Sequence, residues 1–147
     1  MPHSYASNLV HVVFSTKERR NLVPADRQER LWAYLIGIGR NHNIPVLAAG
    51  GTANHIHLLV ALPQALTLAK AIQAFKANSS RWMSDHGPAF AWQEGYGAFS
   101  VSPTHAERVK DYIRRQEEHH RKRSFEDEFL AMLKKAGIAF DPQFVFG

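Results

Sequence analysis

The chain of 147 residues is 45% hydrophobic and 21% charged, a composition typical of one folded domain and not of a disordered tail. It contains no cysteine, which excludes disulfides, thiolate metal sites and cysteine nucleophiles. The formal net charge of +5 favours a polyanionic partner, with nucleic acid as the first candidate.

The N-terminal stretch MPHSYASNLVHVVF lacks a basic region followed by a long apolar segment, so we expect no signal peptide. No apolar run in the sequence is long enough to span a bilayer. We therefore expect a cytoplasmic protein with no membrane partner, and residues 1–147 are expected to form one domain.

The first part of the chain predicts three strands and two helices. Residues 8–16, NLVHVVFST, are β-branched and apolar and predict a strand. Residues 26–41 carry apolar side chains at helical spacing and predict a helix. Two further strands are predicted at 44–49 and 54–62, separated by a glycine turn, and a strong helix follows at 67–85.

The C-terminal part predicts one more strand and two more helices. The strand is short and covers residues 98–102. Thr104, followed by Glu107 three residues later, has the pattern of a capping box and predicts a helix over about 104–120. A last helix is predicted over about 125–136.

The predicted order β-α-β-β-α-β, followed by C-terminal helices, is that of the ferredoxin-like, split βαβ arrangement. This is an α+β fold in which two helices cover one face of a four-stranded antiparallel sheet. We expect the other face to be open for a ligand, a partner or an additional helix.

The stretch NHIHLLV places two histidines at the start of an apolar strand. Residues i and i+2 of a strand point the same way, so His55 and His57 share one face while Ile56 and Leu58 share the other. Their Cα atoms are expected roughly 6.5 Å apart, close enough for both imidazoles to bind one cation. A His-x-His pair is common in strands without a metal, and two ligands under-coordinate a cation, so a third must come from elsewhere.

Tyr112 and Gln116 lie four residues apart on the predicted helix and therefore share one face. A tyrosine hydroxyl, with an ordinary pKa near ~10, attacks only a polarised target and must lose its proton as it does so. A glutamine amide oxygen is a hard, neutral ligand that suits Mg²⁺ or Mn²⁺. Basic residues surround the pair, as a phosphodiester substrate requires: Arg108, Lys110, Arg114 and Arg115.

Other residues compete for both roles, and a packing role for Tyr112 is open. Tyr5, Tyr34 and Tyr96 are rival nucleophiles, but none lies four residues from a hard ligand on a basic helix. His119 and His120 are rival third ligands because they continue much the same helical stripe. For both histidines the sequence favours a solvated position within the run EEHHRKR.

Taken together, these features resemble the single-tyrosine HUH transposases of small bacterial insertion sequences, the TnpA type, including relatives that act on repetitive extragenic palindromes. The resemblance covers nearly the whole chain. It is carried by the segments HVVFSTKERR, NHIHLLV, AIQAFKANSSRWM, FAWQEGYGAFSVS, YIRRQEEHH and SFEDEF.

The resemblance implies a bacterial DNA transposase that cleaves and rejoins single-stranded DNA at hairpin-bearing element ends. Tyr112 would form a 5′-phosphotyrosine intermediate, while His55, His57 and Gln116 would hold one Mg²⁺ or Mn²⁺ ion. No nucleotide cofactor is implied, because the covalent intermediate conserves the phosphodiester energy. The family also implies a homodimer joined through the sheets, with cleavage in cis or in trans left open.

One position departs from the family pattern, and one further histidine is a possible ligand. Asn54 stands where many relatives have an acidic residue before the first histidine, so a supporting carboxylate is not expected there. His11 faces the same way as a candidate ligand, but a packed or hydrogen-bonded structural role is favoured.

Seven basic residues are candidate phosphate contacts: Lys17, Arg19, Arg20, Lys76, Arg81, Arg114 and Arg115.

Two other functions remain open. The chain could be a non-catalytic module that binds single-stranded nucleic acid, in which case aromatic side chains should stack bases on the open sheet face. Phe14 and Phe99 are the main candidates for that stacking. Alternatively, the enzyme could be a domesticated nickase that acts on palindromic repeats.

Overall fold

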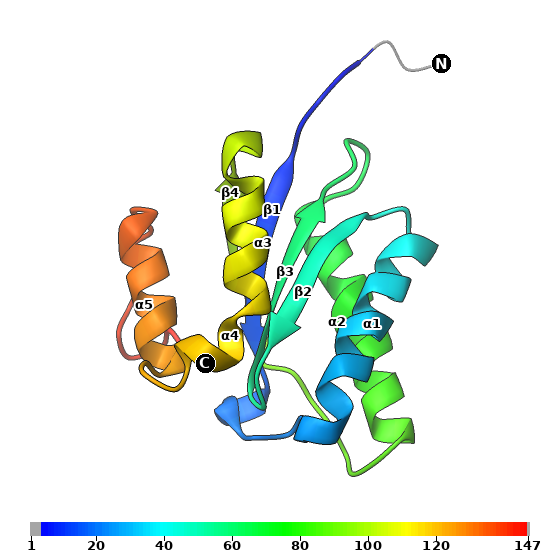
Figure 1. Cartoon of the computed structure of the whole chain (residues 1–147), viewed down its shortest axis with the longest axis vertical. Helices are drawn as coiled ribbons and strands as arrows, with labels where there is room; N and C mark the ends of the chain where they lie inside the picture. Colours follow the sequence, from blue (N-terminus) through cyan, green and yellow to red (C-terminus); the bar gives the residue numbers. More distant parts are fainter. Residues whose placement is uncertain (1–3, 147) are drawn as a thin grey trace.

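The computed structural model describes residues 4–146 (Figure 1). None of its described helices has the length and apolar character needed to cross a membrane. In chain order the elements are β1 (Leu9–Ser15), the 3₁₀ turn η1 (Lys17–Arg19), α1 (Ala25–Asn41), β2 (Val46–Gly51), β3 (His55–Ala61), α2 (Leu68–Asp85), β4 (Gly97–Val101), the 3₁₀ turn η2 (Pro103–His105), α3 (Ala106–Arg114), α4 (Gln116–His119) and α5 (Phe125–Lys135).

The four strands form one antiparallel sheet in the order β2-β3-β1-β4. Sequence neighbours β2 and β3 pair directly, whereas β1 lies between β3 and β4, which is the split βαβ topology. The predicted ferredoxin-like α+β fold is therefore confirmed. The register places Val13 opposite His57 and Ser15 opposite His55, and β1 pairs with β3 along its whole length.

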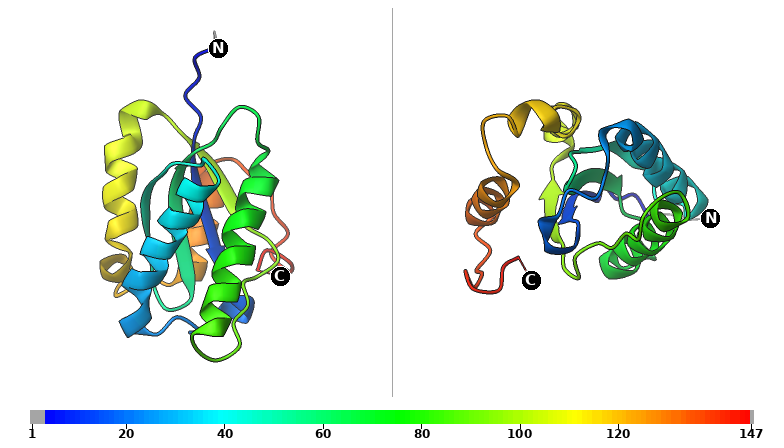
Figure 2. Two further views of the ribbon diagram at one scale, coloured as in Figure 1. Left: turned by 90° about the vertical axis from the view of Figure 1, so that its right-hand side faces the viewer. Right: turned by 90° about the horizontal axis from the view of Figure 1, so that it is seen from below.

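Helices α1 and α2 cover one face of the sheet and enclose the main core (Figures 1 and 2). The alternate residues of β1 and β3 that point to this face are apolar, as the strand period of two requires. Burial of these side chains attaches both strands to the helices. The core side chains of the two strands are Val10, Val12, Phe14, Ile56, Leu58 and Val60.

The other face is covered by additional helices, one of the three occupants expected from sequence. Helix α3 packs on it through Ile113, which is buried with Leu59. Helix α5 packs beside α3 through Phe129, which is buried with Val13 of β1. Figure 2, seen from below, shows the sheet between the two helical layers. The physical reason is that this face also carries apolar side chains, whose exposure would cost free energy.

The helix predicted over residues 104–120 is interrupted. The capping box is not formed, because Ser102 Oγ accepts the bond from the Thr104 backbone N–H and Thr104 enters the turn η2. Helix α3 therefore begins at Ala106, two residues later than predicted. A second break lies at Arg115, and there the Gln116 side-chain Nε2 donates to the Tyr112 carbonyl at 3.3 Å.

Smaller boundary differences concern the second strand, which begins at Val46 and not at the predicted Ile44. The Ile44 backbone N–H donates to the Gly39 carbonyl at 2.8 Å, which belongs to the end of α1. The Ile44 side chain is buried in the main core. Ile44 thus closes the helix-to-strand connection before strand pairing starts.

Gly50 tests the contact that holds α3 on the sheet. A Cβ added there would lie 2.2 Å from the Ile113 carbonyl oxygen, so strand and helix would have to separate. We expect Gly50→Ala to lower the free energy of unfolding by about 1–3 kcal/mol, measured by urea denaturation. The control is Gly37→Ala in α1, where an added Cβ meets nothing within 4 Å and should stabilise by up to about 1 kcal/mol. Equal stabilities of the two variants would contradict this packing.

Candidate active site

Strand β3 directs its two histidines to the face covered by α3, α4 and α5. His55 and His57 are each 0% exposed, whereas the neighbouring Ile56 and Leu58 belong to the main core on the opposite face. The predicted sharing of a face is confirmed, but the prediction that this face forms an open site is wrong. The Phe125 ring of α5 stacks on His55 with ring centroids 4.5 Å apart, which closes the site from the α5 side.

Each histidine is oriented by a partner at its Nδ1 atom. His55 Nδ1 lies 2.9 Å from Asn54 Oδ1 and 3.0 Å from Thr52 Oγ1. His57 Nδ1 lies 2.8 Å from His11 Nε2. These bonds occupy Nδ1 and leave both Nε2 atoms to face the site. His11 is thus a hydrogen-bonded structural residue, as favoured from sequence, and the Asn54 amide takes the position of a supporting carboxylate.

Gln116, the first residue of α4, extends its side chain to the histidine pair. Its Oε1 lies 3.0 Å from His55 Nε2, and the side chain is 1% exposed. His120 also reaches this point, because its Nε2 lies 3.1 Å from Gln116 Oε1. The solvated position expected for His120 is therefore wrong. His119 is exposed and packs its ring against Tyr112, with centroids 4.6 Å apart.

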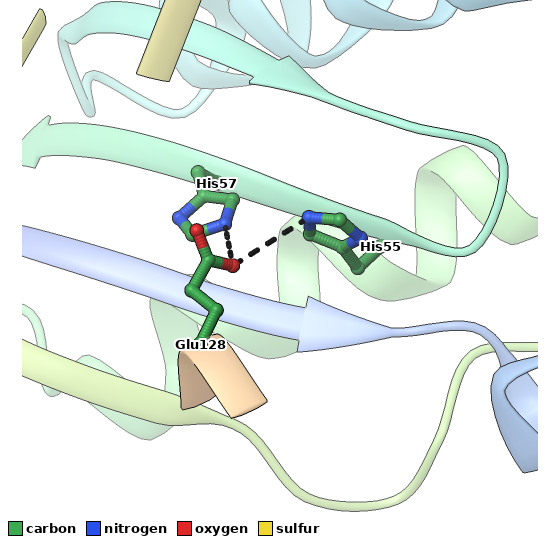
Figure 3. Close-up of side chains that lie close together, drawn as sticks. All are labelled: His55, His57 and Glu128. Carbon is green, nitrogen blue, oxygen red and sulfur yellow. Dashed lines mark hydrogen bonds and ion pairs between the residues drawn. The ribbon is translucent and has the colours of Figure 1, made fainter. Parts of the chain in front are cut away.

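Glu128 of α5 completes the cluster and was not predicted (Figure 3). Its Oε1 lies 3.1 Å from His57 Nε2 and 3.8 Å from His55 Nε2, and His120 Nε2 is 3.2 Å away. The signal in the sequence is that Glu128 lies within the buried stripe of α5, between Phe125 and Phe129. An acidic residue in an apolar stripe needs a polar partner, and the histidines provide it.

Tyr112 reaches the cluster through its hydroxyl, which donates a hydrogen bond to Glu128 Oε2. Its ring lies 5.8 Å from the His57 ring, and the side chain is half-buried. The rival tyrosines are elsewhere: Tyr5 is 95% exposed, Tyr34 stacks on Trp82, and Tyr96 lies near Lys76. The structure therefore brings only Tyr112 among the four tyrosines to the histidine pair.

Burial sets the protonation of the site. It lowers the pKa of both His11 and His55 to about 3, so their imidazoles are neutral at neutral pH. Burial, helped by the Glu128 hydrogen bond, raises the pKa of Tyr112 and keeps the phenol protonated. Burial alone would raise the pKa of Glu128, but hydrogen bonds from His120, His57 and Tyr112 hold it well below its usual range.

The donor set fits a divalent cation. Neutral imidazole nitrogens together with amide and carboxylate oxygens are ligands for Mg²⁺, Mn²⁺ and related ions. The ligand atoms of His55, His57 and Glu128 all lie within 4.8 Å of one another. Bonds of roughly 2.1 Å at right angles place neighbouring ligand atoms about 3 Å apart, which matches the short separations within this cluster.

The candidate phosphate contacts divide into exposed residues and residues with internal partners. Arg20 makes a surface ion pair with Glu18 at 3.2 Å and remains exposed. Arg19 Nη1 donates to the Phe146 backbone carbonyl at 3.2 Å. Lys76 Nζ donates to the backbone carbonyls of residues 93–95 at 2.7–3.1 Å, which indicates a structural role. The exposed members are Lys17, Arg20, Arg81, Arg114 and Arg115.

Residues 4–116 match the protein family described as IS200-like transposases. The chain belongs to the IS200-like transposase family. The match contains His55, His57, Tyr112 and Gln116, and it ends before α5 and Glu128. Membership in this family implies that the chain is a DNA-processing enzyme. The buried group of His55, His57 and Glu128 is compatible with a metal site. Among curated proteins, none matches the sequence significantly.

Two solved structures share the fold of this transposase. One is a candidate transposase from Deinococcus radiodurans R1, with a TM-score of 0.62 and 20% identity over 79% of this chain and 96% of the other. The second is a REP-associated tyrosine transposase bound to a REP hairpin, with a TM-score of 0.56 and 15% identity over 77% and 68% of the two chains. At these identities the likeness establishes the fold alone.

The buried histidines of the transposase predict a pH-dependent stability. Between about pH 6.5 and pH 3 the unfolded chain binds protons at His11 and His55, whereas the folded chain does not. The free energy of unfolding of the metal-free protein should therefore fall as the pH falls, by up to about 1.4 kcal/mol per pH unit for each histidine. Urea denaturation in chelator at about pH 7.5 and about pH 5 measures the loss.

The contribution of one histidine can be separated with a matched pair of variants. His11→Gln should reduce the pH dependence, while His42→Gln, which changes an exposed histidine, should leave it as in the unmodified protein. The same pH dependence in both variants would contradict the assignment.

Proposed function

We propose that this protein cleaves and rejoins single-stranded DNA at hairpin-bearing element ends. In this proposal Tyr112 is the nucleophile, and His55, His57 and Gln116 hold one divalent cation, Mg²⁺ or Mn²⁺. The observation that carries the proposal is that the Tyr112 hydroxyl, both imidazole Nε2 atoms and the Gln116 amide oxygen belong to one buried polar cluster.

The proposed step is an in-line displacement at phosphorus. The Tyr112 oxygen bonds to the scissile phosphate as the bond to the 3′ oxygen breaks, which leaves a 5′-phosphotyrosine and a free 3′-hydroxyl. The phenol loses its proton in the step, and the 3′ oxygen takes one up. The bound cation would supply electrostatic stabilisation for the charge that develops on the phosphate and on the leaving oxygen. Attack by another 3′-hydroxyl reverses the step and rejoins strands, with no nucleotide cofactor.

The proposed substrate rests on the family and on the charge of the chain. A related transposase has been solved bound to a REP hairpin, which supports hairpin DNA as the ligand here. The proposed phosphate contacts are the exposed basic residues Lys17, Arg20, Arg81, Arg114 and Arg115. We also propose that the protein acts as a homodimer in the bacterial cytoplasm. Because Tyr112 meets the histidines within one chain, cleavage in cis needs no residue from the partner.

The first alternative, a non-catalytic binding module, has less support. Its two stacking candidates are covered, because Phe14 is 0% exposed in the main core and Phe99 packs against the α5 cluster. A domesticated nickase acting on palindromic repeats keeps the same site and chemistry. The DNA that the protein cleaves would distinguish a domesticated nickase from a transposase.

The nucleophile is tested by incubating the protein with labelled single-stranded DNA from the hairpins that flank its gene, with and without Mn²⁺. We expect a covalent adduct that withstands denaturation and requires the metal. Tyr112→Phe should form no adduct, while Tyr96→Phe, a matched change at an exposed tyrosine, should form it normally. DNA binding without an adduct in the presence of metal would favour the binding module.

The third ligand is tested by three alanine substitutions. We expect Gln116→Ala to reduce metal-dependent adduct formation by about 10–100-fold, because the amide oxygen is lost from the cation site. His119→Ala removes an exposed ring and should retain the activity. If His120→Ala alone abolishes metal-dependent cleavage, His120 is the third ligand and the assignment of Gln116 is wrong.

A further inference from the structure

Three rings are stacked on the helical layer that lies on the opposite side of the sheet from Tyr112. Tyr34 of α1 and Trp82 of α2 have ring centroids 4.8 Å apart and planes only 15° from parallel. The His86 ring follows at 5.0 Å from Trp82, and its Nδ1 lies 2.8 Å from the Trp82 carbonyl oxygen. The left view of Figure 2 shows α1 and α2 side by side toward the viewer. The stack therefore joins the two helices.

Core packing does not account for this stack. Tyr34 is 36% exposed and His86 is exposed, whereas Trp32 of the same helix α1 is 8% exposed and belongs to the main core. An exposed ring gains little from removal of apolar surface from water. Exposed aromatic rings are, in contrast, the platforms on which proteins stack the bases of single-stranded nucleic acid.

A small hollow adjoins Tyr34 in the groove between the two helices. Its volume is about 250 Å³, and its lining includes Tyr34, Gly37, Asn41, His42 and Asn78. Pockets for larger organic ligands have volumes of about 300–1,000 Å³, so this hollow suits a smaller, flat group.

Gly37 keeps the hollow open, and the packing of the fold gives no other reason for a glycine there. A Cβ added at Gly37 would meet nothing within 4 Å. Gly39, two residues later, differs because its added Cβ would lie 2.4 Å from the Ile44 carbonyl oxygen. Glycine inside a helix costs about 1 kcal/mol relative to alanine. At Gly39 close packing explains that cost, whereas at Gly37 only the empty space beside Tyr34 is gained.

The polar side chains of the hollow can form hydrogen bonds with a base edge. Asn78 Nδ2 donates to the Ala74 carbonyl at 2.8 Å, and within residues 4–146 no hydrogen bond engages its Oδ1. That oxygen can accept from the amino group of a base. Asn41 and His42 are exposed at the same hollow and carry further donors and acceptors.

Positive charge beside the stack favours a nucleic acid over an uncharged partner. Arg30 lies one helical turn before Tyr34, Arg81 precedes Trp82, and Arg27 lies against Gly87 at the end of α2. In the described part of the chain, none of the three arginines forms an ion pair. Asp85 is the only acidic residue of α2. The guanidinium groups are thus available to phosphates on either side of a bound base.

We propose that this surface, which we call the base site, binds one unpaired base of the DNA substrate. The base lies against the exposed Tyr34 ring and above Gly37, and its edge faces Asn78. The inference rests on the proposed function only in taking single-stranded hairpin DNA as the ligand. It adds a determinant of substrate choice on the side of the sheet remote from the nucleophile.

Tryptophan fluorescence can report on this site directly. Trp32 and Trp92 are each 8% exposed, so Trp82 is the tryptophan that a bound base can approach. The probe is a hairpin from the DNA that flanks the gene, with its unpaired nucleotides, and the control is a fully paired duplex of the same stem. Chelator is present throughout, so binding is measured without metal-dependent cleavage. Fluorescence anisotropy of labelled DNA gives the affinity in the same samples.

We expect the hairpin to quench Trp82 and the paired duplex to leave it unchanged. Replacement of one particular unpaired nucleotide by an abasic site should remove the quenching. Tyr34→Ala should weaken hairpin binding about tenfold because the stacking contact is lost, while Tyr34→Phe keeps the ring and should retain the affinity. Trp82→Phe should abolish the signal and retain the affinity.

Gly37→Leu fills the hollow without a backbone clash, and it should also weaken hairpin binding about tenfold. Urea denaturation should show no loss of stability, because leucine is a better helix former than glycine. Equal quenching by hairpin and paired duplex, or full affinity in Gly37→Leu, would overturn the base site. If Gly37→Leu instead abolishes self-association in sedimentation and leaves DNA affinity unchanged, the occupant is a second copy of the chain and the base site is overturned.

The base site and the proposed function fail in distinguishable ways. If the hairpin quenches Trp82 but the unmodified protein forms no adduct with Mn²⁺, the nucleophile assignment fails and the base site stands. If the adduct forms but Trp82 is not quenched, the function stands and the base site is overturned.

Discussion

Strand β3 has apolar side chains on one face and imidazoles on the other, and the rest of the site depends on that alternation. Ile56, Leu58 and Val60 are fixed in the main core, so His55 and His57 must point to the opposite face. A slip of one residue in the register with β1 would place the imidazoles in the apolar core, which makes the register strongly specified. The site geometry therefore follows from core packing on the far side of the sheet.

Burial of so many polar groups is tolerated because they satisfy one another. Within residues 4–146, every buried side-chain nitrogen and oxygen has a hydrogen-bond partner. In a low-dielectric interior an unpaired member would be costly, so removal of Glu128 must be matched by another anion or by solvent.

The sequence predicts the parts of the site that obey a local period, and it misses those set by tertiary contact. His55 and His57 follow from strand alternation, and the pairing of Tyr112 with Gln116 follows from helical spacing. The break at Arg115 could not be predicted, because it depends on a side-chain amide that bonds a backbone carbonyl. Glu128 lies on a separate helix, and only its position inside an apolar stripe marks it. The covering of the histidine face likewise depends on the tertiary packing of α5 against the sheet, which no local sequence pattern specifies.

The most direct test of the central claim is pulsed electron paramagnetic resonance of the protein loaded with one equivalent of Mn²⁺. If the paired imidazoles bind the cation, the spectrum will show directly coordinated imidazole nitrogens. That coupling will weaken in His55→Ala and in His57→Ala and weaken further in the double variant. A Mn²⁺ ion without imidazole coupling, or with coupling that survives the double substitution, would contradict the account.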